Sequence, residues 1–255
     1  MKVKFLNIIS AIVFSVGLSG TARAAEIKVL TAGAYKQVVL ALQPAFEQQT
    51  GHKLVVDNGT VGQLIKRISG GEAFDVVIVS PGAIEELVKK DKVVAGSRTM
   101  LARVGVGVMV KDGTPKPDIS TVDAFKKSLL AAKSVAYIDP ASGGSSGIYL
   151  AGLFEKMGIA NELKPKAKLI HGGYVADHIA KGEAEIGIHQ ISEIVAVKGV
   201  LLVGPLPAEI QNYTTYAAGL GAASKAREPA SALIKNLAGP AAEPVLKSRG
   251  MTPAS

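Results

Sequence analysis

The chain has 255 residues, of which 48% are hydrophobic and 20% are charged, so it can bury a sizeable core as one large domain or two small ones. It contains no cysteine, which excludes disulfide bonds, zinc–thiolate sites, thiol catalysis and iron–sulfur clusters held by cysteine. The formal net charge is +8, but aromatic residues make up only 5% of the chain, and no stacking platform for nucleic acid is visible. This balance fits a small anionic ligand or solubility alone, and we expect no nucleic-acid partner.

The first 24 residues read as a secretory signal peptide. Lys2 and Lys4 precede an apolar run at residues 5–18, and Ala22-Arg23-Ala24 is a small-residue cleavage pattern. The apolar run is shorter than the roughly 20 residues that a bilayer span needs, which disfavours a membrane anchor. We therefore expect cleavage after Ala24 and a periplasmic protein.

Apolar strands alternate with amphipathic helices from residue 26 onward. In the first unit, EIKVLTAG is a short strand, AYKQVVLALQPAFEQQTG has helical apolar spacing and stops at Gly51, and HKLVVDNGT is the next strand. The predicted strands are 26–33, 52–60, 74–80, 101–111, 133–140, 166–173, 184–190, 200–207 and 213–223; the predicted helices are 34–51, 61–71, 81–93, 120–132, 148–158, 174–183, 191–197 and 228–251.

This alternation predicts an α/β protein with parallel sheets in two blocks. The long strands near 101–111 and 213–223 are candidates for the crossings between the blocks. We expect residues 25–105 plus 217–255 to form lobe I and residues 106–216 to form lobe II. A cleft between two such lobes is a common site for a small ligand.

The stretch DPASGGSSGIYL, residues 139–150, places small residues and hydroxyls at a helix N-terminus. Free backbone N–H groups and the helix dipole bind anions there, and Ser145 and Ser146 add donors. A P-loop is excluded because no Gly-Lys-Ser/Thr follows, and a hydrolase nucleophile elbow is excluded by the spacing of the glycines. An anion site and a flexible helix cap both remain possible interpretations.

Two further turns of small residues end the first two strands. Thr31 and Gly33 precede Tyr35 in the first turn, and Thr60 lies in the second, before the helix that carries Arg67. Because the carboxyl ends of parallel strands meet at one edge of a sheet, the three turns are expected to face one crevice.

Two histidines stand at strand ends, where residues of a cleft are found. His171 precedes Gly172, and His189 ends the strand AEIGIHQ. Neither pairs with other ligands at metal-binding spacing, so we predict no metal site and no cofactor. A neutral histidine there serves either as an acid–base group or as a hydrogen-bond donor to a carboxylate.

Nearly the whole mature chain resembles the periplasmic molybdate-binding proteins of ABC importers. The resemblance lies in IKVLTAGA, AFEQQTGHKL, QLIKRISGGEAFDVVIVSPGAIEEL, YIDPASGGSSGIYLAGLFEKMGI and GGYVADHIAKGEAEIGIHQISE. It implies a type II periplasmic binding-protein fold with two hinged lobes, an importer in the membrane as partner, and a monomer.

Several hydroxyl-bearing positions of that family are changed in this sequence. Ala34 replaces a serine after the first strand, Val61 and Gly62 replace a serine pair, and Gln190 replaces a tyrosine. These departures from the family predict an organic polycarboxylate rather than molybdate or tungstate, because larger donors suit carboxylates. The expected ligand-binding residues are Thr31, Gly33, Tyr35, Thr60, Arg67, Ser145, Ser146, Tyr149, Tyr174, His189 and Gln190.

A narrower resemblance links residues 113–150 and the run EAEIGIHQISEI to a periplasmic aconitate isomerase of the same two-lobed fold. Such an enzyme needs allylic proton transfer between two carbons of a tricarboxylate. The resemblance then makes His189, Tyr149, Glu193 and His171 the candidate proton-transfer groups. Three hypotheses therefore stand: a polycarboxylate-binding importer component, an aconitate isomerase, and a molybdate binder that uses backbone N–H groups.

Overall fold

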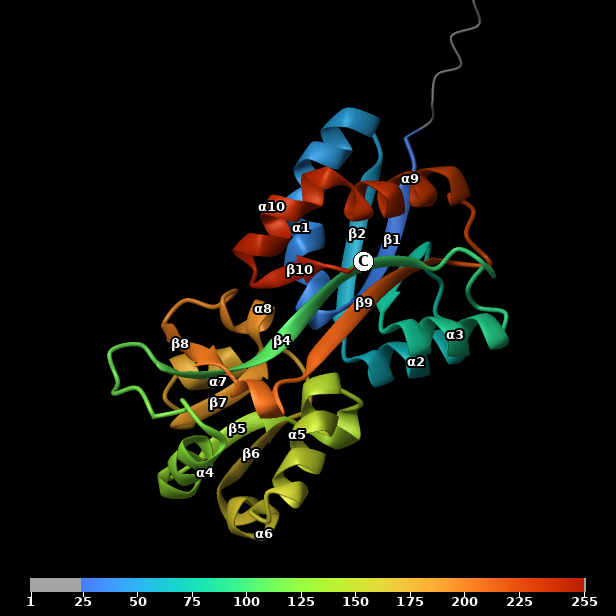
Figure 1. Ribbon diagram of the computed structural model, residues 1–255. Helices are drawn as coiled ribbons and strands as arrows, with labels where there is room; N and C mark the ends of the chain where they lie inside the picture. Colours follow the sequence, from blue (N-terminus) through green and yellow to red (C-terminus); the bar gives the residue numbers. More distant parts are fainter. Residues whose placement is uncertain (1–23, 255) are drawn as a thin grey trace, which may run out of the picture.

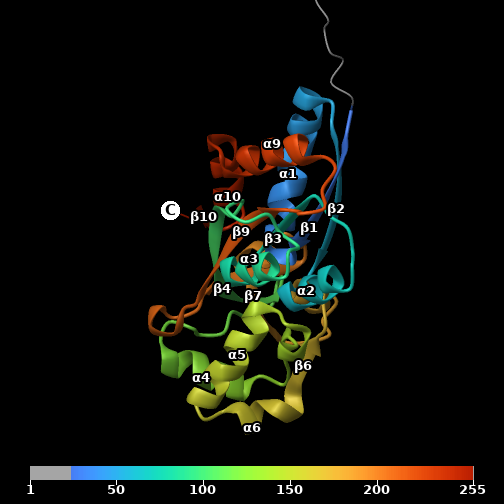
Figure 2. The same cartoon turned by 90° about the vertical axis from the view of Figure 1, so that its right-hand side faces the viewer.

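The computed structural model describes residues 24–254, so the predicted signal peptide lies outside the described residues except for its last position. Two α/β lobes lie one above the other, and Figures 1 and 2 show them from two sides. The first lobe contains β1 (Glu26–Ala32), α1 (Gly33–Thr50), β2 (Lys53–Gly59), α2 (Val61–Ser69), β3 (Val76–Val79), α3 (Pro81–Lys89), β9 (Tyr213–Leu220), α9 (Arg227–Ala238), α10 (Glu243–Ser248) and β10 (Met251–Pro253). The second contains α4 (Val122–Ala131), β5 (Val135–Ile138), α5 (Ser145–Lys156), α6 (Ala160–Leu163), β6 (Ala167–Ile170), α7 (Val175–Ala180), β7 (Ile186–Gln190), α8 (Ile191–Ile194) and β8 (Val200–Pro205).

One strand, β4 (Thr99–Lys111), is shared by both lobes. The strands are hydrogen-bonded in the order β2-β1-β3-β9-β4-β7-β5-β6, and β8 and β10 also pair with β4. The first half of β4 pairs with β9 up to Gly105, and the second half pairs with β7 and β8 from Val106 onward. The predicted crossing at 101–111 is this strand.

The strand β9 lies wholly in the sheet of the first lobe. Tyr213 is the register partner of Gly105, and Leu220 is the register partner of Val76. A lobe boundary between residues 216 and 217 would divide this strand. We therefore propose that the chain returns to the first lobe before Tyr213.

Each lobe has its own hydrophobic cores on the two faces of its sheet. In the first lobe, Tyr35 and Tyr216 are buried in one core with their ring centroids 6.4 Å apart. In the second, Tyr137 meets Phe154 edge-on at 5.4 Å between ring centroids. These separate cores make each lobe a packed unit of its own.

The predicted C-terminal helix at 228–251 is wrong in its continuity. Helix α9 stops before Gly239, residues 240–242 form a 3₁₀ turn, α10 follows, and β10 adds to β4. Pro240 explains the break, because it offers no N–H and disfavours helical geometry in the residue before it. The short helix α6 was not predicted, and α5 begins at Ser145, three residues earlier than expected.

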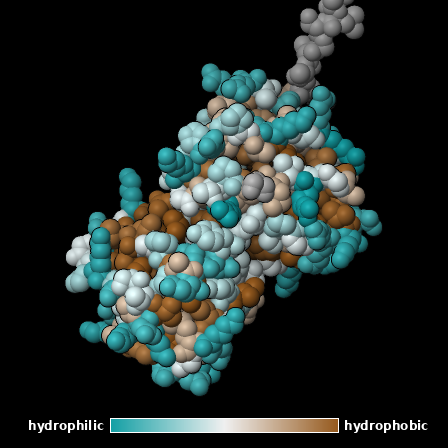
Figure 3. Space-filling model, in the orientation of Figure 1, coloured by the Kyte–Doolittle hydropathy of each residue, from teal (hydrophilic) through white to brown (hydrophobic). Residues whose placement is uncertain are grey.

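The surface is mixed in character. Figure 3 shows hydrophilic side chains over much of one face, with apolar side chains gathered near β8 in the second lobe. Within residues 24–254, no helix has both the length and the apolar content needed to cross a bilayer.

Candidate functional site

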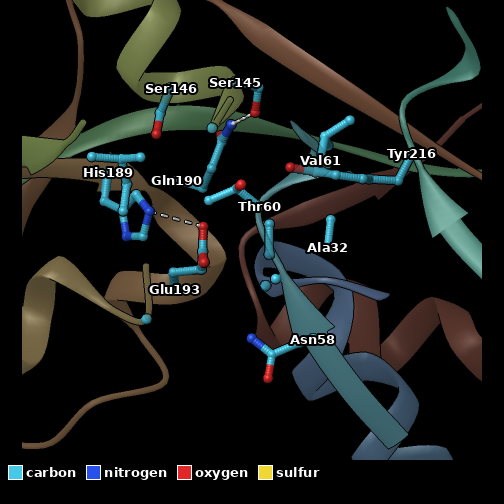
Figure 4. A pocket seen from close by; sticks show the side chains of 16 residues that line it. Ala32, Asn58, Thr60, Val61, Ser145, Ser146, His189, Gln190, Glu193 and Tyr216 are labelled. Atoms are coloured by element: carbon cyan, nitrogen blue, oxygen red, sulfur yellow. Dashed lines mark hydrogen bonds and ion pairs between the residues drawn. The ribbon is translucent and has the colours of Figure 1, made fainter. Parts of the chain in front are cut away.

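A small cavity lies between the lobes, at the carboxyl ends of strands from both (Figure 4). The space open to the centres of water molecules is about 40 Å³, room for a few water molecules or a small anion. The lining residues are Ala32, Gly33, Ala34, Asn58, Gly59, Thr60, Val61 and Tyr216 from the first lobe, and Ile138, Gly144, Ser145, Ser146, Gly173, His189, Gln190 and Glu193 from the second.

Three helices of at least nine residues begin at this cavity: α1 at Gly33, α2 at Val61 and α5 at Ser145. None has an acidic residue in its first turn, and α1 and α5 have no side-chain cap. Helix α2 is capped by Thr60, whose hydroxyl accepts from the Gln63 N–H in a capping box. The positive ends of α1 and α5 are therefore available to a negative group in the cavity.

The hydroxyls of α5 differ in how they are used. Ser145 Oγ accepts a hydrogen bond from Gln190 Nε2 at 3.1 Å, and Gln190 Nε2 also donates to Thr214 Oγ1 at 2.8 Å. Ser146 is only 2% exposed, and its hydroxyl has no hydrogen-bond partner among the described residues. Ser146 can therefore donate to a bound ligand without breaking an existing contact.

The most unusual feature of the cavity is a buried histidine–glutamate pair. His189 Nε2 lies 3.2 Å from Glu193 Oε2, and the two side chains are 3% and 9% exposed. Burial lowers the pKa of His189 from 6.5 to about 3 and raises the pKa of Glu193 from 4.5 to about 8. At neutral pH the pair is therefore an uncharged imidazole beside a protonated carboxyl group.

Gly33 makes room for that carboxyl group. A Cβ atom at this position would lie 2.5 Å from Glu193 Oε1, closer than packed atoms approach. Glu193 comes from the second lobe and Gly33 begins α1 in the first, so the carboxyl group reaches across to the start of α1. Ser192, beside Glu193, donates to the Ala34 carbonyl at 2.8 Å and holds α8 against the same helix.

The structure brings together part of the predicted ligand set at this cavity: Gly33, Thr60, Ser145, Ser146, His189 and Gln190, together with Glu193 from the predicted proton-transfer groups. Arg67 does not line it. Its guanidinium contacts Asp57 and binds Glu72 through Nε at 2.5 Å and one NH₂ group at 2.7 Å, and these contacts lower the pKa of Glu72 to about 2.

Four other predicted site residues do not line the cavity and have partners outside it. Tyr35 donates to the Leu237 carbonyl at 3.3 Å in the core, and Tyr149 donates to the Ile210 carbonyl at 2.5 Å. Tyr174 accepts from Gln37 at 3.2 Å. His171 is 82% exposed beside Asp139, with 2.9 Å between its Nδ1 and the carboxylate.

Thr31 is buried behind the cavity wall, and its hydroxyl donates to the Ala32 carbonyl at 3.1 Å. Tyr216 lines the cavity but was not singled out from the sequence, and Asn58 lines it as the first residue of the turn predicted at 58–62. Alternation along the strand at 213–223 indicates that Tyr216 faces the side of the sheet opposite to its neighbours. It does not indicate which side of the sheet faces the cleft.

Three hydrogen bonds to backbone carbonyls join the two lobes beside the cavity. The Gly62 N–H donates to the Gly143 carbonyl at 3.2 Å, Thr60 donates to the Ser142 carbonyl, and Gln63 Nε2 donates to the His171 carbonyl at 2.8 Å. A Cβ atom on Gly62 would lie 2.8 Å from Gly143 Cα, so two glycines are needed for this approach. We call Gly62 and Gly143 the glycine latch.

Comparison with known proteins agrees with this two-lobed geometry. Residues 27–252 match the family model described as bacterial extracellular solute-binding protein. The chain belongs to this family.

The relatives of this solute-binding protein carry different names. It is 36% identical over 233 residues to an aconitate isomerase from Pseudomonas sp., covering 89% of this chain and 87% of the relative. It is 28% identical over 241 residues to the molybdate-binding protein ModA of Azotobacter vinelandii, covering 91% and 92%.

Solved structures confirm the predicted type II fold. The periplasmic molybdate-binding protein of Azotobacter vinelandii superposes with a TM-score of 0.73 at 21% identity, over 90% of this chain and 100% of that one. The sulfate-binding protein SubI of Mycobacterium tuberculosis H37Rv gives 0.75 at 21% identity, over 91% and 88%. At this identity the likeness concerns the fold alone.

The His189–Glu193 pair predicts a specific dependence of stability on pH. Because the folded-state pKa of Glu193 is raised to about 8, its contribution to stability is fully present below pH 4.5 and is lost as pH rises through 8. Since the pKa of His189 is lowered, its contribution is present above pH 6.5 and is lost as pH falls toward 3. We expect Glu193→Gln to remove much of the fall in Tm between about pH 6.5 and 8.5.

Thermal unfolding across this range measures the effect, with Glu155→Gln on the exposed face of α5 as the control. The same pH slope in wild type and Glu193→Gln would show that Glu193 is ionised in the folded protein.

The glycine latch predicts that Gly62→Ala disfavours closure. The added methyl overlaps Gly143, and overpacking of this kind costs about 1–3 kcal/mol, which falls on the closed state alone. Gly82→Ala is a matched control, because Gly82 is also the second residue of its helix and its Cβ would meet nothing within 4 Å. Small-angle scattering should give a larger radius of gyration for Gly62→Ala than for Gly82→Ala; equal radii would reject the latch.

Proposed function

We propose that this protein captures a small anion that carries carboxylate groups, by closing its two lobes around it. The observation that carries the proposal is a buried cavity with the N-termini of α1 and α5 uncapped, a free Ser146 hydroxyl and no lysine or arginine in its lining. Oriented backbone dipoles and neutral hydroxyls stabilise a negative group without a fixed countercharge. As a member of the solute-binding family, the protein would deliver this anion to an importer in the membrane.

The lining favours a carboxylate over a tetrahedral oxyanion. Ala34 and Val61, at the starts of α1 and α2, bring no hydroxyl to the cavity, and the Glu193 carboxyl group occupies the space beside Gly33. A protonated carboxyl group donates a short hydrogen bond to a carboxylate, whereas an ionised one would repel it. The anion therefore binds best where Glu193 keeps its proton, below about pH 8.

Binding the anion requires the two lobes to close, because its contacts come from both lobes. The ligand meets α5 in the second lobe and α1 in the first, so binding to both requires the approach that brings Gly62 to Gly143. Because β4 continues from one sheet into the other, a bend along this strand lets the lobes part without breaking either core. Ligand affinity then includes the free energy of closing the lobes.

A second candidate function is isomerisation of aconitate, and the His189–Glu193 pair favours it. A base removes a proton from the methylene carbon, the electron pair shifts the double bond by one position, and an acid returns a proton to the former alkene carbon. Glu193 is protonated and can supply a proton, while His189 is uncharged and becomes a stronger base when a bound anion raises its lowered pKa. The helix ends would stabilise the negative charge that develops on the substrate.

Binding is tested by a thermal-shift panel of trans-aconitate, cis-aconitate, citrate, sulfate and molybdate, followed by calorimetry. We expect a carboxylate to give the largest shift, and Ser146→Ala to weaken its binding about tenfold, as for loss of a hydrogen bond to a charged group. Arg67→Ala should bind as wild type, since its guanidinium is held by Asp57 and Glu72. Stabilisation by molybdate or sulfate alone would reject the carboxylate proposal.

Isomerase activity is tested by incubating the protein with trans-aconitate and separating the isomers by chromatography. If the second candidate is right, cis-aconitate accumulates to a fixed equilibrium ratio, and Glu193→Gln binds trans-aconitate but converts it at least about a hundredfold more slowly, as for loss of an acid–base group. Tight binding of trans-aconitate without conversion would leave the protein as a binding component only.

A further inference from the structure

Tyr216 is the one tyrosine among the residues that line the cavity. It lies on β9 in the first lobe and is 2% exposed, and its hydroxyl faces the Ser145 hydroxyl at the start of α5. In Figure 4 the Tyr216 hydroxyl points into the cavity from the side opposite His189 and Glu193. Because a tyrosine hydroxyl both donates and accepts hydrogen bonds, this one can accept from Ser145 and still donate to whatever occupies the cavity.

The surrounding fold fixes the position of this hydroxyl. Tyr216 is paired in the sheet with Ala102 of β4, and its ring packs in the core of the first lobe against Tyr35, with an angle of 45° between the rings. Burial raises the pKa of Tyr216, the charge of Glu193 raises it further, and the Ser145 hydroxyl opposes part of the rise. Tyr216 is therefore a rigid, neutral hydrogen-bond donor throughout the neutral pH range.

Tyr35 is a tyrosine in the same core whose hydroxyl bonds to the backbone and does not face the cavity. Both rings are fully buried in the same cluster, but Tyr35 donates to the Leu237 carbonyl at 3.3 Å and does not line the cavity. The two tyrosines thus share a hydrophobic setting and differ in what the hydroxyl faces. Phenylalanine would fill the core equally well at Tyr216, so packing does not explain its hydroxyl.

We propose that Tyr216 is a specificity-determining residue that donates a hydrogen bond to the ligand carboxylate held at the N-terminus of α5. A carboxylate has two oxygens that accept hydrogen bonds in different directions. One accepts from Ser146 and the backbone of α5 in the second lobe, and the other accepts from Tyr216 in the first. The same carboxylate thereby bridges the lobes, which couples recognition to closure. This inference rests on the proposed binding of a carboxylate anion.

The test is calorimetry with trans-aconitate on wild type, Tyr216→Phe and Tyr35→Phe. We expect Tyr216→Phe to weaken binding about tenfold to a hundredfold, the range for loss of a hydrogen bond to a charged group, and Tyr35→Phe to change it less than about threefold. The loss in Tyr216→Phe should be the same factor at pH 6 and pH 8, because neither side chain titrates there, whereas Glu193→Gln should alter the pH dependence. Thermal unfolding of both variants checks that the core is intact.

The outcomes separate the two proposals. If wild type binds trans-aconitate and Tyr216→Phe binds it equally well, the role of Tyr216 is overturned and the proposed function stands. If Tyr35→Phe and Tyr216→Phe lose affinity and stability alike, Tyr216 acts only through packing, and its role is again overturned. If wild type binds no carboxylate, the proposed function fails, and the inference fails with it.

Discussion

Backbone hydrogen bonding along β4 is the constraint on which the rest of the molecule depends. One half of this strand completes the sheet of the first lobe through β9 and β10, and the other half completes the sheet of the second lobe through β7 and β8. Two packed units are thus joined by a continuous ladder. The carboxyl ends of their parallel strands, and the helices that follow them, face one another across a narrow space.

The cavity between the lobes has, within the described part of the chain, no cationic side chain to balance the charge of an anion. No lysine or arginine is among the described residues that line it, and Arg67, in the helix that begins at one of the cavity turns, is paired with Asp57 and Glu72. The cavity instead offers helix ends, hydroxyls and a histidine–glutamate pair that burial keeps uncharged. Burial of a lone carboxylate beside an anionic ligand would be costly, so the protonation of Glu193 and the binding of an anion support each other.

Relatives with the same architecture show how little the fold alone says about the ligand. A molybdate-binding protein and a sulfate-binding protein share this arrangement, and a sequence relative is named as an isomerase. The cavity of this chain has Ala34 and Val61 at the starts of two helices, with Tyr216, His189 and Glu193 around the space they leave. Because one scaffold hosts several functions, the ligand has to be argued from such side chains and not from the fold.

The alternation of strands and helices, the two-lobed class and the helix start at Val61 could be predicted from the residues alone, because periodicity and turn chemistry are local properties. Helix α5 begins three residues before its predicted start. Which side chains reach the cavity depends on packing between distant segments. Arg67, Tyr149 and Tyr35 are polar residues near cleft turns, but partners elsewhere hold them, and the partner of Tyr35 lies 202 residues along the chain. Tyr216 lines the cavity because sheet pairing turns its hydroxyl toward a helix of the other lobe. Contacts between segments that are distant in the sequence cannot be predicted from a local pattern.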